Sequence, residues 1–324
     1  MKTTYYSILA AAACGMAFGT TAYTTPVGYE TVPVASGFNY LGTRLHEAPV
    51  AAGTFETVGS SSVTDTGANF SALSSNGSKT FIIEITTGSG ILTQVLGSAV
   101  SGDTITTTDD LSAAGVANGA SYLIRPASTL ASVFGANNSA GLAAGFGGIS
   151  GDIIFVPDGS GGYNQYYYDD LESSWADVNG APVNGAEIAL VYVDSVILSS
   201  TGAITNLVVT GTVKTKNTQT AVATGFNYVS SIYPAGATLS STFDSAIPDL
   251  DKGFGGISGD IFFVPDGSGG FNQFYYDDLE SSWADVNGAP INGSSIEMKP
   301  GVIFSNDGSP MNLKLTPPAT YSGL

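Results

Sequence analysis

An internal duplication constrains the fold of this chain more than any other feature. Residues 145–185 recur as residues 253–293, and only four positions differ between the two blocks. Chance does not produce such a match, so the chain must build the same local structure twice. Every substitution exchanges one apolar or aromatic side chain for another. The four pairs are Ile154/Phe262, Tyr163/Phe271, Tyr166/Phe274 and Val183/Ile291.

The duplication is wider than these blocks. Residues 36–40 recur as residues 224–228, an offset of 188 residues, whereas the blocks are offset by 108. The first copy therefore carries about 80 extra residues. We predict a first unit at residues 23–213 with an insertion at about 59–139, and a second unit at residues 214–324. The units should pack together, because the second alone is short for a β core.

Within each block, the local pattern predicts a meander of three strands. In the first copy an apolar run at residues 152–156 precedes a turn of Asp, Ser and Gly, and an aromatic run at residues 163–168 follows it. Asp caps such turns and Gly supplies positive φ, so the two runs should form a hairpin. Residues 174–178 provide the third strand. We therefore predict an all-β fold, mainly antiparallel, made of two unequal duplicated β units packed together.

The insertion also has a mainly β pattern. Its predicted strands are residues 80–86, 91–96, 103–107 and 121–125. Residues 128–134, which precede Gly135, predict one short capped helix, and residues 109–116 predict a further helical turn. The insertion should thus contain one or two short helices.

The chain is strongly acidic. It has 27 Asp and Glu residues against 9 Lys and Arg residues, a net charge of −18. This charge repels phosphate backbones and anionic membrane surfaces, so nucleic acid is not a predicted partner. Divalent cations and neutral surfaces remain open. Apolar residues form 43% of the chain, which is enough for a real core.

The N-terminus predicts a secretion signal at residues 1–22. Lys2 precedes an apolar run at residues 5–18, and small residues follow up to Ala22. A membrane anchor is the alternative, but the run is short and rich in Ala. Cys14, the one cysteine, lies in this signal, where lipid attachment is the alternative to removal. We expect an exported mature chain, in the cell envelope or outside the cell, without a thiol or a transmembrane segment.

No conventional enzyme active site is evident. His46 is the one histidine, which excludes zinc chemistry based on several histidines, and we expect it in a partly exposed loop. Neither a Gly-x-Ser-x-Gly elbow nor a Walker loop is present. Paired carboxylates in each block could serve a glycosidase, but two near-identical catalytic centres in one small protein would be unusual. We predict that the chain is not an enzyme.

The repeated acidic residues are candidate cation ligands. Each block holds six acids and neither Lys nor Arg. Converging carboxylates repel one another unless a cation bridges them, and hard oxygen ligands suit calcium. The alternative is a solvated acidic surface with Asp residues that cap turns. The candidate ligands are Asp158, Asp169, Asp170, Glu172 and Asp177, with Asp266, Asp277, Asp278, Glu280 and Asp285 in the second copy.

The aromatic residues of the blocks divide into two groups. Tyr163 and Tyr166 become Phe in the second copy, so a hydrogen-bonding role is not kept and their rings should be packed. The rings that are identical in both copies are the candidates for contact with a ligand or partner, and packing in the core or between subunits is the alternative. They are Tyr167, Tyr168 and Trp175, with Tyr275, Tyr276 and Trp283.

Several motifs resemble those of a known family. They are the secretion signal, residues 24–28, 37–42 and 125–135, and the order of residues 152–156, 166–168 and Trp175. In these features most of the first unit is similar to an uncharacterised family of secreted β proteins found chiefly in verrucomicrobial-type bacteria. Members of that family end in a Pro-Gly strand, which residues 300–304 match, whereas residues 193–195 of the first unit do not. The resemblance implies secretion and a β fold, and no activity.

These features favour a structural protein of the cell envelope or extracellular space, able to self-associate into a surface layer or filament. The basis is the small number of charged residues, the high content of Gly, Ser and Thr, and the duplicated aromatic block. The alternative is an extracellular binding module for polysaccharide or another surface ligand. Calcium would be its cofactor if the repeated acids converge.

Overall fold

The computed structural model describes residues 26–74, 81–88, 90–92, 94–146, 150–159, 161–254 and 259–324. The predicted secretion signal, including Cys14, lies outside the described residues. Strands dominate and the helices are few and short, which confirms the predicted all-β class. In the described part of the chain, we find no helix that is both long and apolar enough to span a membrane.

The first unit consists mainly of two antiparallel sheets. A five-stranded sheet has the order β14-β13-β12-β16-β2, and a three-stranded sheet has the order β1-β17-β3. The two sheets share one core. It contains Leu198 of the five-stranded sheet and Val32 and Leu207 of the three-stranded sheet. The elements are β1 (Val27–Pro33), β2 (Gly37–Gly42), β3 (Leu45–His46), β11 (Ser128–Thr129), α2 (Leu130–Phe134), β12 (Ile153–Pro157), β13 (Tyr163–Asp169), β14 (Ser174–Asp177), β15 (Ala189–Leu190), β16 (Ser195–Ser200) and β17 (Asn206–Val213).

The second unit repeats this plan. Its five-stranded sheet has the order β22-β21-β20-β23-β19, the counterpart of the first, and β18 pairs with β24. The predicted meander is therefore present in both copies, as β12 to β14 and as β20 to β22. The elements are β18 (Thr218–Val222), β19 (Gly225–Ser230), α3 (Leu239–Phe243), η1 (Asp244–Asp249), β20 (Ile261–Pro265), β21 (Phe271–Asp277), β22 (Ser282–Asp285), η2 (Gly293–Ser295), β23 (Gly301–Asn306), β24 (Met311–Leu315) and η3 (Ala319–Gly323).

The hairpin turn of each block follows from its local chemistry. Oδ1 of Asp158 accepts a hydrogen bond from the amide of Gly162 at 3.0 Å. Gly159 and Gly161 have φ values of 77° and 91°, a region that suits glycine. Because capping and backbone freedom are both local, the same turn recurs at Asp266.

A short capped helix precedes each block. In α2 the N-cap is Thr129, whose side chain accepts from the amide of Ser132 at 3.1 Å. Thr238 and Ser241 make the same capping box in α3. The predicted helix after Ser128 is thus present, one residue further along, and it belongs to the duplicated unit rather than to the insertion. Residues 109–116 form turns and not a helix.

The insertion is a separate seven-stranded antiparallel sheet with the order β4-β10-β7-β8-β9-β6-β5. It spans Ala51 to Pro126, nearer the N-terminus than the predicted residues 59–139. One face covers its own core, which includes Phe55 and Phe81. The elements are β4 (Ala51–Thr54), β5 (Thr57–Val58), β6 (Ser62–Thr64), α1 (Ser71–Ser74), β7 (Phe81–Thr87), β8 (Gln94–Ser101), β9 (Thr104–Thr107) and β10 (Ser121–Pro126).

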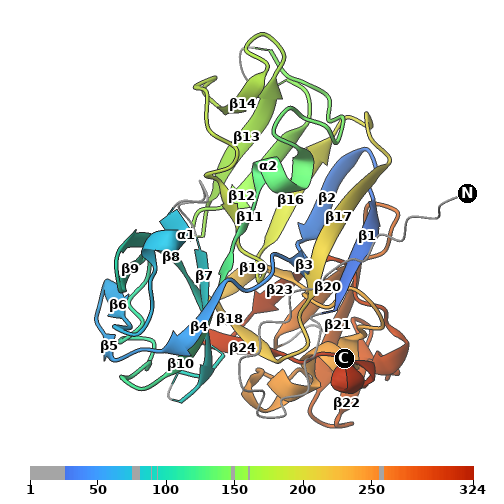
Figure 1. Ribbon diagram of the computed structural model, residues 1–324. Helices are drawn as coiled ribbons and strands as arrows, with labels where there is room; N and C mark the ends of the chain where they lie inside the picture. Colours follow the sequence, from blue (N-terminus) through green and yellow to red (C-terminus); the bar gives the residue numbers. More distant parts are fainter. Residues whose placement is uncertain are drawn as a thin grey trace, which may run out of the picture.

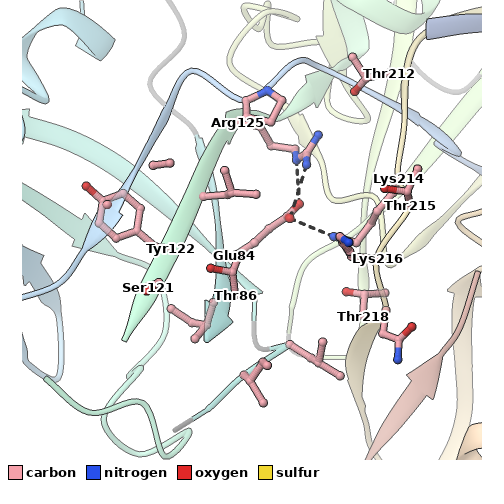
Figure 2. A pocket seen from close by; sticks show the side chains of 18 of the residues that line it. Glu84, Thr86, Ser121, Tyr122, Arg125, Thr212, Lys214, Thr215, Lys216 and Thr218 are labelled. Atoms are coloured by element: carbon pink, nitrogen blue, oxygen red, sulfur yellow. Dashed lines mark hydrogen bonds and ion pairs between the residues drawn. The ribbon is translucent and has the colours of Figure 1, made fainter. Parts of the chain in front are cut away.

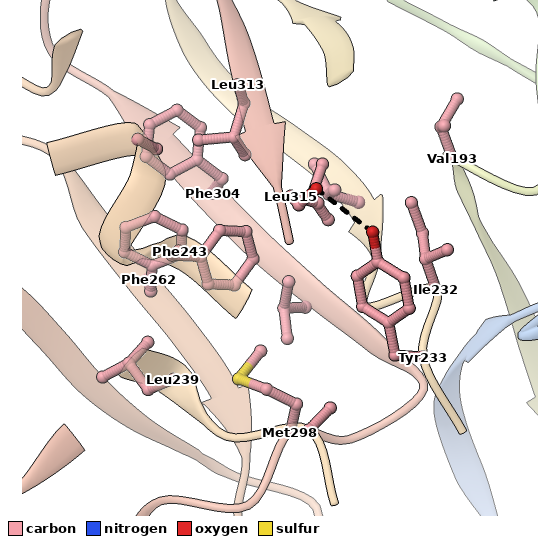
Figure 3. Packing of buried hydrophobic residues seen from close by; sticks show 14 of the residues in the cluster. Val193, Ile232, Tyr233, Leu239, Phe243, Phe262, Met298, Phe304, Leu313 and Leu315 are labelled. Carbon is pink, nitrogen blue, oxygen red and sulfur yellow. Dashed lines mark hydrogen bonds between the residues drawn. The ribbon is translucent and has the colours of Figure 1, made fainter. Parts of the chain in front are cut away.

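The core of the second unit is completed by other parts of the chain. Figure 3 shows Phe243, Phe262 and Phe304 packed together in it, with Val193 of the first unit nearby. Ile82 of the inserted sheet belongs to the same buried cluster. These contributions compensate for the small size of the unit, because a short β segment buries too little apolar surface alone. Figure 1 accordingly shows the inserted sheet beside β18 and β24.

The two units meet across a pseudo-twofold axis. Tyr40 stacks on its own counterpart Tyr228, with ring centroids 6.0 Å apart and an interplanar angle of 5°. Tyr163 and Phe271, which also correspond, contact these rings edge-on, at 5.4 Å from Tyr228 and 5.2 Å from Tyr40 respectively. Asp194 adds a backbone bridge to Val229. A junction in which residues contact their own counterparts is the arrangement expected of a symmetric dimer.

Candidate functional site

The predicted contact aromatics mostly lie in the interior. Tyr167 and Tyr275 are each 1% exposed, and Trp175 and Trp283 are 2% and 4% exposed. Tyr168 is 9% exposed and Tyr276 is only partly buried. Five of these six side chains are therefore inaccessible to a ligand, and the alternative of core packing accounts for them.

Internal hydrogen bonds explain why both copies keep these hydroxyl groups. The Tyr167 hydroxyl donates to Oδ2 of Asp169 at 3.0 Å, and that of Tyr168 donates to the carbonyl of Ser173 at 2.8 Å. The corresponding groups of the second copy make the same bonds. By contrast, Tyr163 and Tyr166 are half-buried, and their rings pack against Tyr228 and the first core. The identical hydroxyls therefore stabilise the strands and turns of each block.

The predicted acidic ligands are spread over three turns in each block. Oδ1 of Asp169 accepts from the amides of Leu171 and Glu172, and Oδ1 of Asp177 accepts from the amides of Asn179 and Ala181. The second copy repeats the pattern at Asp266, Asp277 and Asp285. Asp158 caps its own turn by accepting the amide of Gly162, and Asp278 pairs with Nζ of Lys252 at 3.4 Å. The other three predicted ligands are exposed. They are Asp170, Glu172 and Glu280.

Among the residues that the structure describes, no three His, Cys, Asp or Glu side chains are grouped so that they could hold a metal ion. The ten predicted ligands are therefore not grouped into such a site, and six of them accept hydrogen bonds from backbone amides. Calcium binding stays a prediction without a site in this part of the chain.

A cleft that the sequence did not predict lies between the inserted sheet and residues 212–218, which join the two units. Its volume is about 820 Å³. Figure 2 shows Glu84 and Arg125 entering it from the sheet and Lys214 from the joining segment. Pockets that hold small organic ligands have volumes of about 300–1,000 Å³.

The register of the inserted sheet places its polar residues toward this cleft. Ile83 and Ile85 face the core of the sheet, so Glu84 between them points to the opposite face. Across the sheet, Glu84 pairs with Leu123 on β10 and with Gln94 on β8. These three side chains form one row, because directly opposed residues of antiparallel strands share a face.

Glu84 holds two cations at the base of the cleft. Nε of Arg125 donates to one carboxylate oxygen at 2.7 Å, and Nζ of Lys214 donates to the other at 2.9 Å. The guanidinium also donates to the carbonyl of Glu47 at 2.8 Å. Glu84, Arg125 and Lys214 are each less than 10% exposed. We call these three residues the buried triad, and its net charge is positive.

Lys214 retains hydrogen-bonding capacity. Glu84 is its one hydrogen-bond acceptor among the described residues, whereas an ammonium group has three donors. Its Nζ also lies 5.2 Å from the centroid of the Tyr192 ring, an attractive arrangement. The ammonium is therefore fixed on one side and open on the side of the cleft.

Burial and charge shift the pKa values of Glu84 and Lys214. Burial would raise the pKa of Glu84, but the charges of Lys214 and Arg125 and their hydrogen bonds lower it to about 2. Burial lowers the pKa of Lys214, and the charge of Glu84 opposes this effect. Two basic side chains therefore share the one carboxylate of Glu84.

His46 lies in the interior next to the triad, whereas the sequence predicted a partly exposed loop. It is 3% exposed on β3, and its ring packs against Tyr192 with centroids 4.7 Å apart. Burial, together with the charges of Arg125 and Lys214, holds the pKa of His46 well below its usual value. The imidazole is therefore neutral and adds no charge to the cleft.

The cleft concentrates positive charge in an acidic chain. Arg125, Lys214 and Lys216 line it, which is three of the nine Lys and Arg residues of the chain. One feature of the sequence indicates this site, because Glu84 interrupts the apolar run at residues 81–85. A charged residue in such a position is almost never buried without a partner.

Comparisons with protein-family models, with curated proteins and with solved structures found no match to this chain. The resemblance to a secreted family therefore stays a prediction, and the geometry of the cleft carries the functional argument.

Proposed function

We propose that this chain is an exported binding module that holds an organic anion in the cleft between the inserted sheet and the joining segment. The single observation that carries this proposal is the buried triad, whose net positive charge faces an open volume. Burying an unbalanced charge is costly, and an anion in the cleft would balance it. Basic residues are few in this chain of net charge −18, and a bound anion would explain why three of them gather at one cleft.

Thermal unfolding in the presence of small and oligomeric carboxylates, sulfate and phosphate tests the proposal. The ionic strength is held constant, so that only specific binding raises the melting temperature. We expect at least one anion to stabilise the mature chain and Lys214→Met to remove the effect. Lys299→Gln is the matched control, because Lys299 is an exposed cation far from the cleft in sequence and does not line it. Failure of every anion to stabilise the wild-type chain would contradict the proposal.

Self-association is a second candidate function, and repeated exposed apolar side chains favour it. Phe146 and Leu171 are 68% and 67% exposed, and their counterparts Phe254 and Leu279 are both 68% exposed. The two side chains lie on neighbouring segments, because the amide of Asp170 donates to the carbonyl of Gly145 at 3.0 Å. Each unit thus presents the same apolar pair to solvent.

Light scattering after size exclusion, with negative-stain microscopy, tests this second function. We expect concentration-dependent assemblies of the mature chain, and their loss in Leu171→Ser/Leu279→Ser. A monomer at high concentration would remove self-association from consideration, and it would leave the anion-binding proposal unaffected.

A further inference from the structure

We infer that the ligand of the cleft is a carboxylate-bearing sugar of the uronic acid class, an inference that rests on the function proposed above. Three properties of the cleft must be satisfied together. They are the single excess positive charge at its base, the hydroxyl and amide groups along its sides, and the aliphatic surface between them.

The charge favours one carboxylate for each binding position. Within the buried triad Glu84 already balances one cation, so a single excess positive charge remains. Lys216 adds an exposed cation at the rim. A phosphate or a polysulfate carries more charge and meets stronger repulsion from a chain of net charge −18. A carboxylate can accept the free hydrogens of the Lys214 ammonium as Glu84 does.

The sides of the cleft favour a hydroxylated ligand over a hydrocarbon chain. Thr86 and Ser121 come from the sheet, and Thr215 and Asn217 come from the joining segment. Figure 2 shows the hydroxyl side chains on both sides of the triad. A fatty acid would remove water from these groups without replacing its hydrogen bonds, which costs binding free energy. Sugar hydroxyls can both donate to them and accept from them.

The remaining surface is aliphatic rather than aromatic. Leu92, Leu123 and Val213 line the cleft, and they can cover the C–H face of a pyranose ring. The Tyr122 ring does not supply a stacking platform, because it packs on Phe55 in the core of the sheet with centroids 4.1 Å apart. We therefore expect recognition to depend on the carboxylate and the hydroxyls and not on ring stacking.

The volume of the cleft indicates how much of the ligand it can hold. A cleft of about 820 Å³ exceeds what one carboxylate ion needs and is in the range for drug-sized ligands. The cleft lies between the inserted sheet and residues 212–218, so a longer oligosaccharide can extend out of it. The end or a short stretch of an acidic polysaccharide fits this description better than a free monosaccharide.

Calorimetric titration of the full mature chain tests the inference with a matched pair of probes. Trigalacturonate and galactotriose have the same ring, and they differ in having a carboxylate or a hydroxymethyl group at C6. We expect trigalacturonate to bind about tenfold or more tightly than galactotriose. Galacturonate alone should bind more weakly than the trisaccharide, which distinguishes an oligosaccharide site from a monosaccharide site. Octanoate and inorganic phosphate are the competing probes.

The variants separate the cleft from general charge effects. Lys214→Met should weaken trigalacturonate binding about tenfold or more, because the ammonium is the open donor. Lys216→Gln, an exposed position at which folding is not at risk, should weaken it several-fold. Lys299→Gln should leave it unchanged, since it removes the same charge elsewhere.

Three results would overturn the inference, and they are distinguishable from one another. If octanoate or phosphate binds and trigalacturonate does not, the sugar class is wrong although the cleft still binds anions. If none of the anionic probes binds, the proposed function fails together with this inference. Equal affinity for trigalacturonate and galactotriose would also overturn it, because the carboxylate would then have no role.

Discussion

The two units contain almost the same block, but the core residues that the block packs against differ between the units. In the first unit Ile154 on β12 lies opposite Leu198 on β16. In the second unit the same positions are Phe262 and Phe304, with ring centroids 4.7 Å apart. Both members of the pair are larger in the second unit. The difference shows that a duplicated core position changes together with its neighbour across the sheet, because close packing couples their volumes.

A second difference lies on the pseudo-twofold axis itself. Gly42 faces its own counterpart Ser230, and Gly301 faces its own counterpart Ser195. A Cβ on Gly301 would lie 2.2 Å from Oγ of Ser195, and one on Gly42 would lie 2.3 Å from Oγ of Ser230. Each of these two pairs therefore consists of one Gly and one Ser, because there is no room for two side chains. A serine at both positions of either pair would clash, so the difference between the copies prevents steric overlap at the junction.

The largest expected effect comes from adding a methyl group at this junction. Gly301→Ala places a carbon 2.2 Å from the Ser195 side chain and 2.8 Å from the carbonyl carbon of Tyr40. We expect a loss of about 3 kcal/mol in the free energy of unfolding, because the backbone of β2 would have to move. Urea unfolding measures it. Gly28→Ala is the control, since a Cβ there meets no atom of the described residues within 4 Å, and equal losses in the two variants would disprove the tight junction.

Exchange of the paired core residues should have the next largest effect. Phe262→Ile leaves a cavity beside Phe243 and Phe304 and should cost about 2 kcal/mol. Ile154→Phe overfills the first core and should cost a similar amount, about 2 kcal/mol. Val183→Ile, a half-buried position at which the copies also differ, should change stability by less than about 0.5 kcal/mol. If the two core variants were equally harmless, the cores would be interchangeable.

We expect the tyrosine hydroxyl groups that are present in both copies to contribute equally to the stability of the two units. Tyr167→Phe and Tyr275→Phe each remove a hydrogen bond to a buried Asp and should cost about 1–2 kcal/mol. Tyr163→Phe, which copies the second unit, should cost less than about 0.5 kcal/mol. Chemical unfolding of the three variants measures these losses. A loss for Tyr163→Phe as large as the other two would assign its hydroxyl a role that its half-buried packing does not indicate.

A pH-dependent difference between the units is expected at Asp194, which corresponds to Pro300. Burial raises the pKa of Asp194 to about 7, well above its ordinary value of 3.8. The stability that this group contributes is therefore complete below about pH 4 and is lost as the pH rises through about 7. Between pH 5 and pH 8 the wild-type melting temperature should fall by about 2–4 °C more than that of Asp194→Asn. Parallel pH profiles of the two proteins would contradict this assignment.

The smallest expected effect concerns calcium. Asp169, Asp177 and their counterparts Asp277 and Asp285 already accept backbone amides within their turns. We expect calcium or EDTA to shift the melting temperature by less than about 1 °C, because a cation would have to displace these bonds. Differential scanning calorimetry measures the shift. A calcium-dependent rise of several degrees would restore the metal hypothesis for the acidic turns.

Much of the local structure could be predicted from the sequence, because the forces that set it act over a few residues. The Asp158 turn, the capping box of α2 and the meander of each block are all of this kind. The hydrogen bond between Tyr167 and Asp169 could also have been predicted from the sequence. Tyr167 and Asp169 are two residues apart on one strand and so share a face, which is enough to predict that the hydroxyl is used internally. Their burial was not predictable, because it depends on loops that cover this face.

The cleft is the part of the molecule that only the tertiary structure decided. Glu84 meets Arg125 across 41 residues and Lys214 across 130 residues, and no local pattern links the three. By itself the sequence determined the duplication, the β class and the sign of the net charge, because repeats, alternation and composition are properties of the chain. Packing of the inserted sheet against the joining segment decided where the few cations gather. The physical reason is that charges interact through space and not along the sequence.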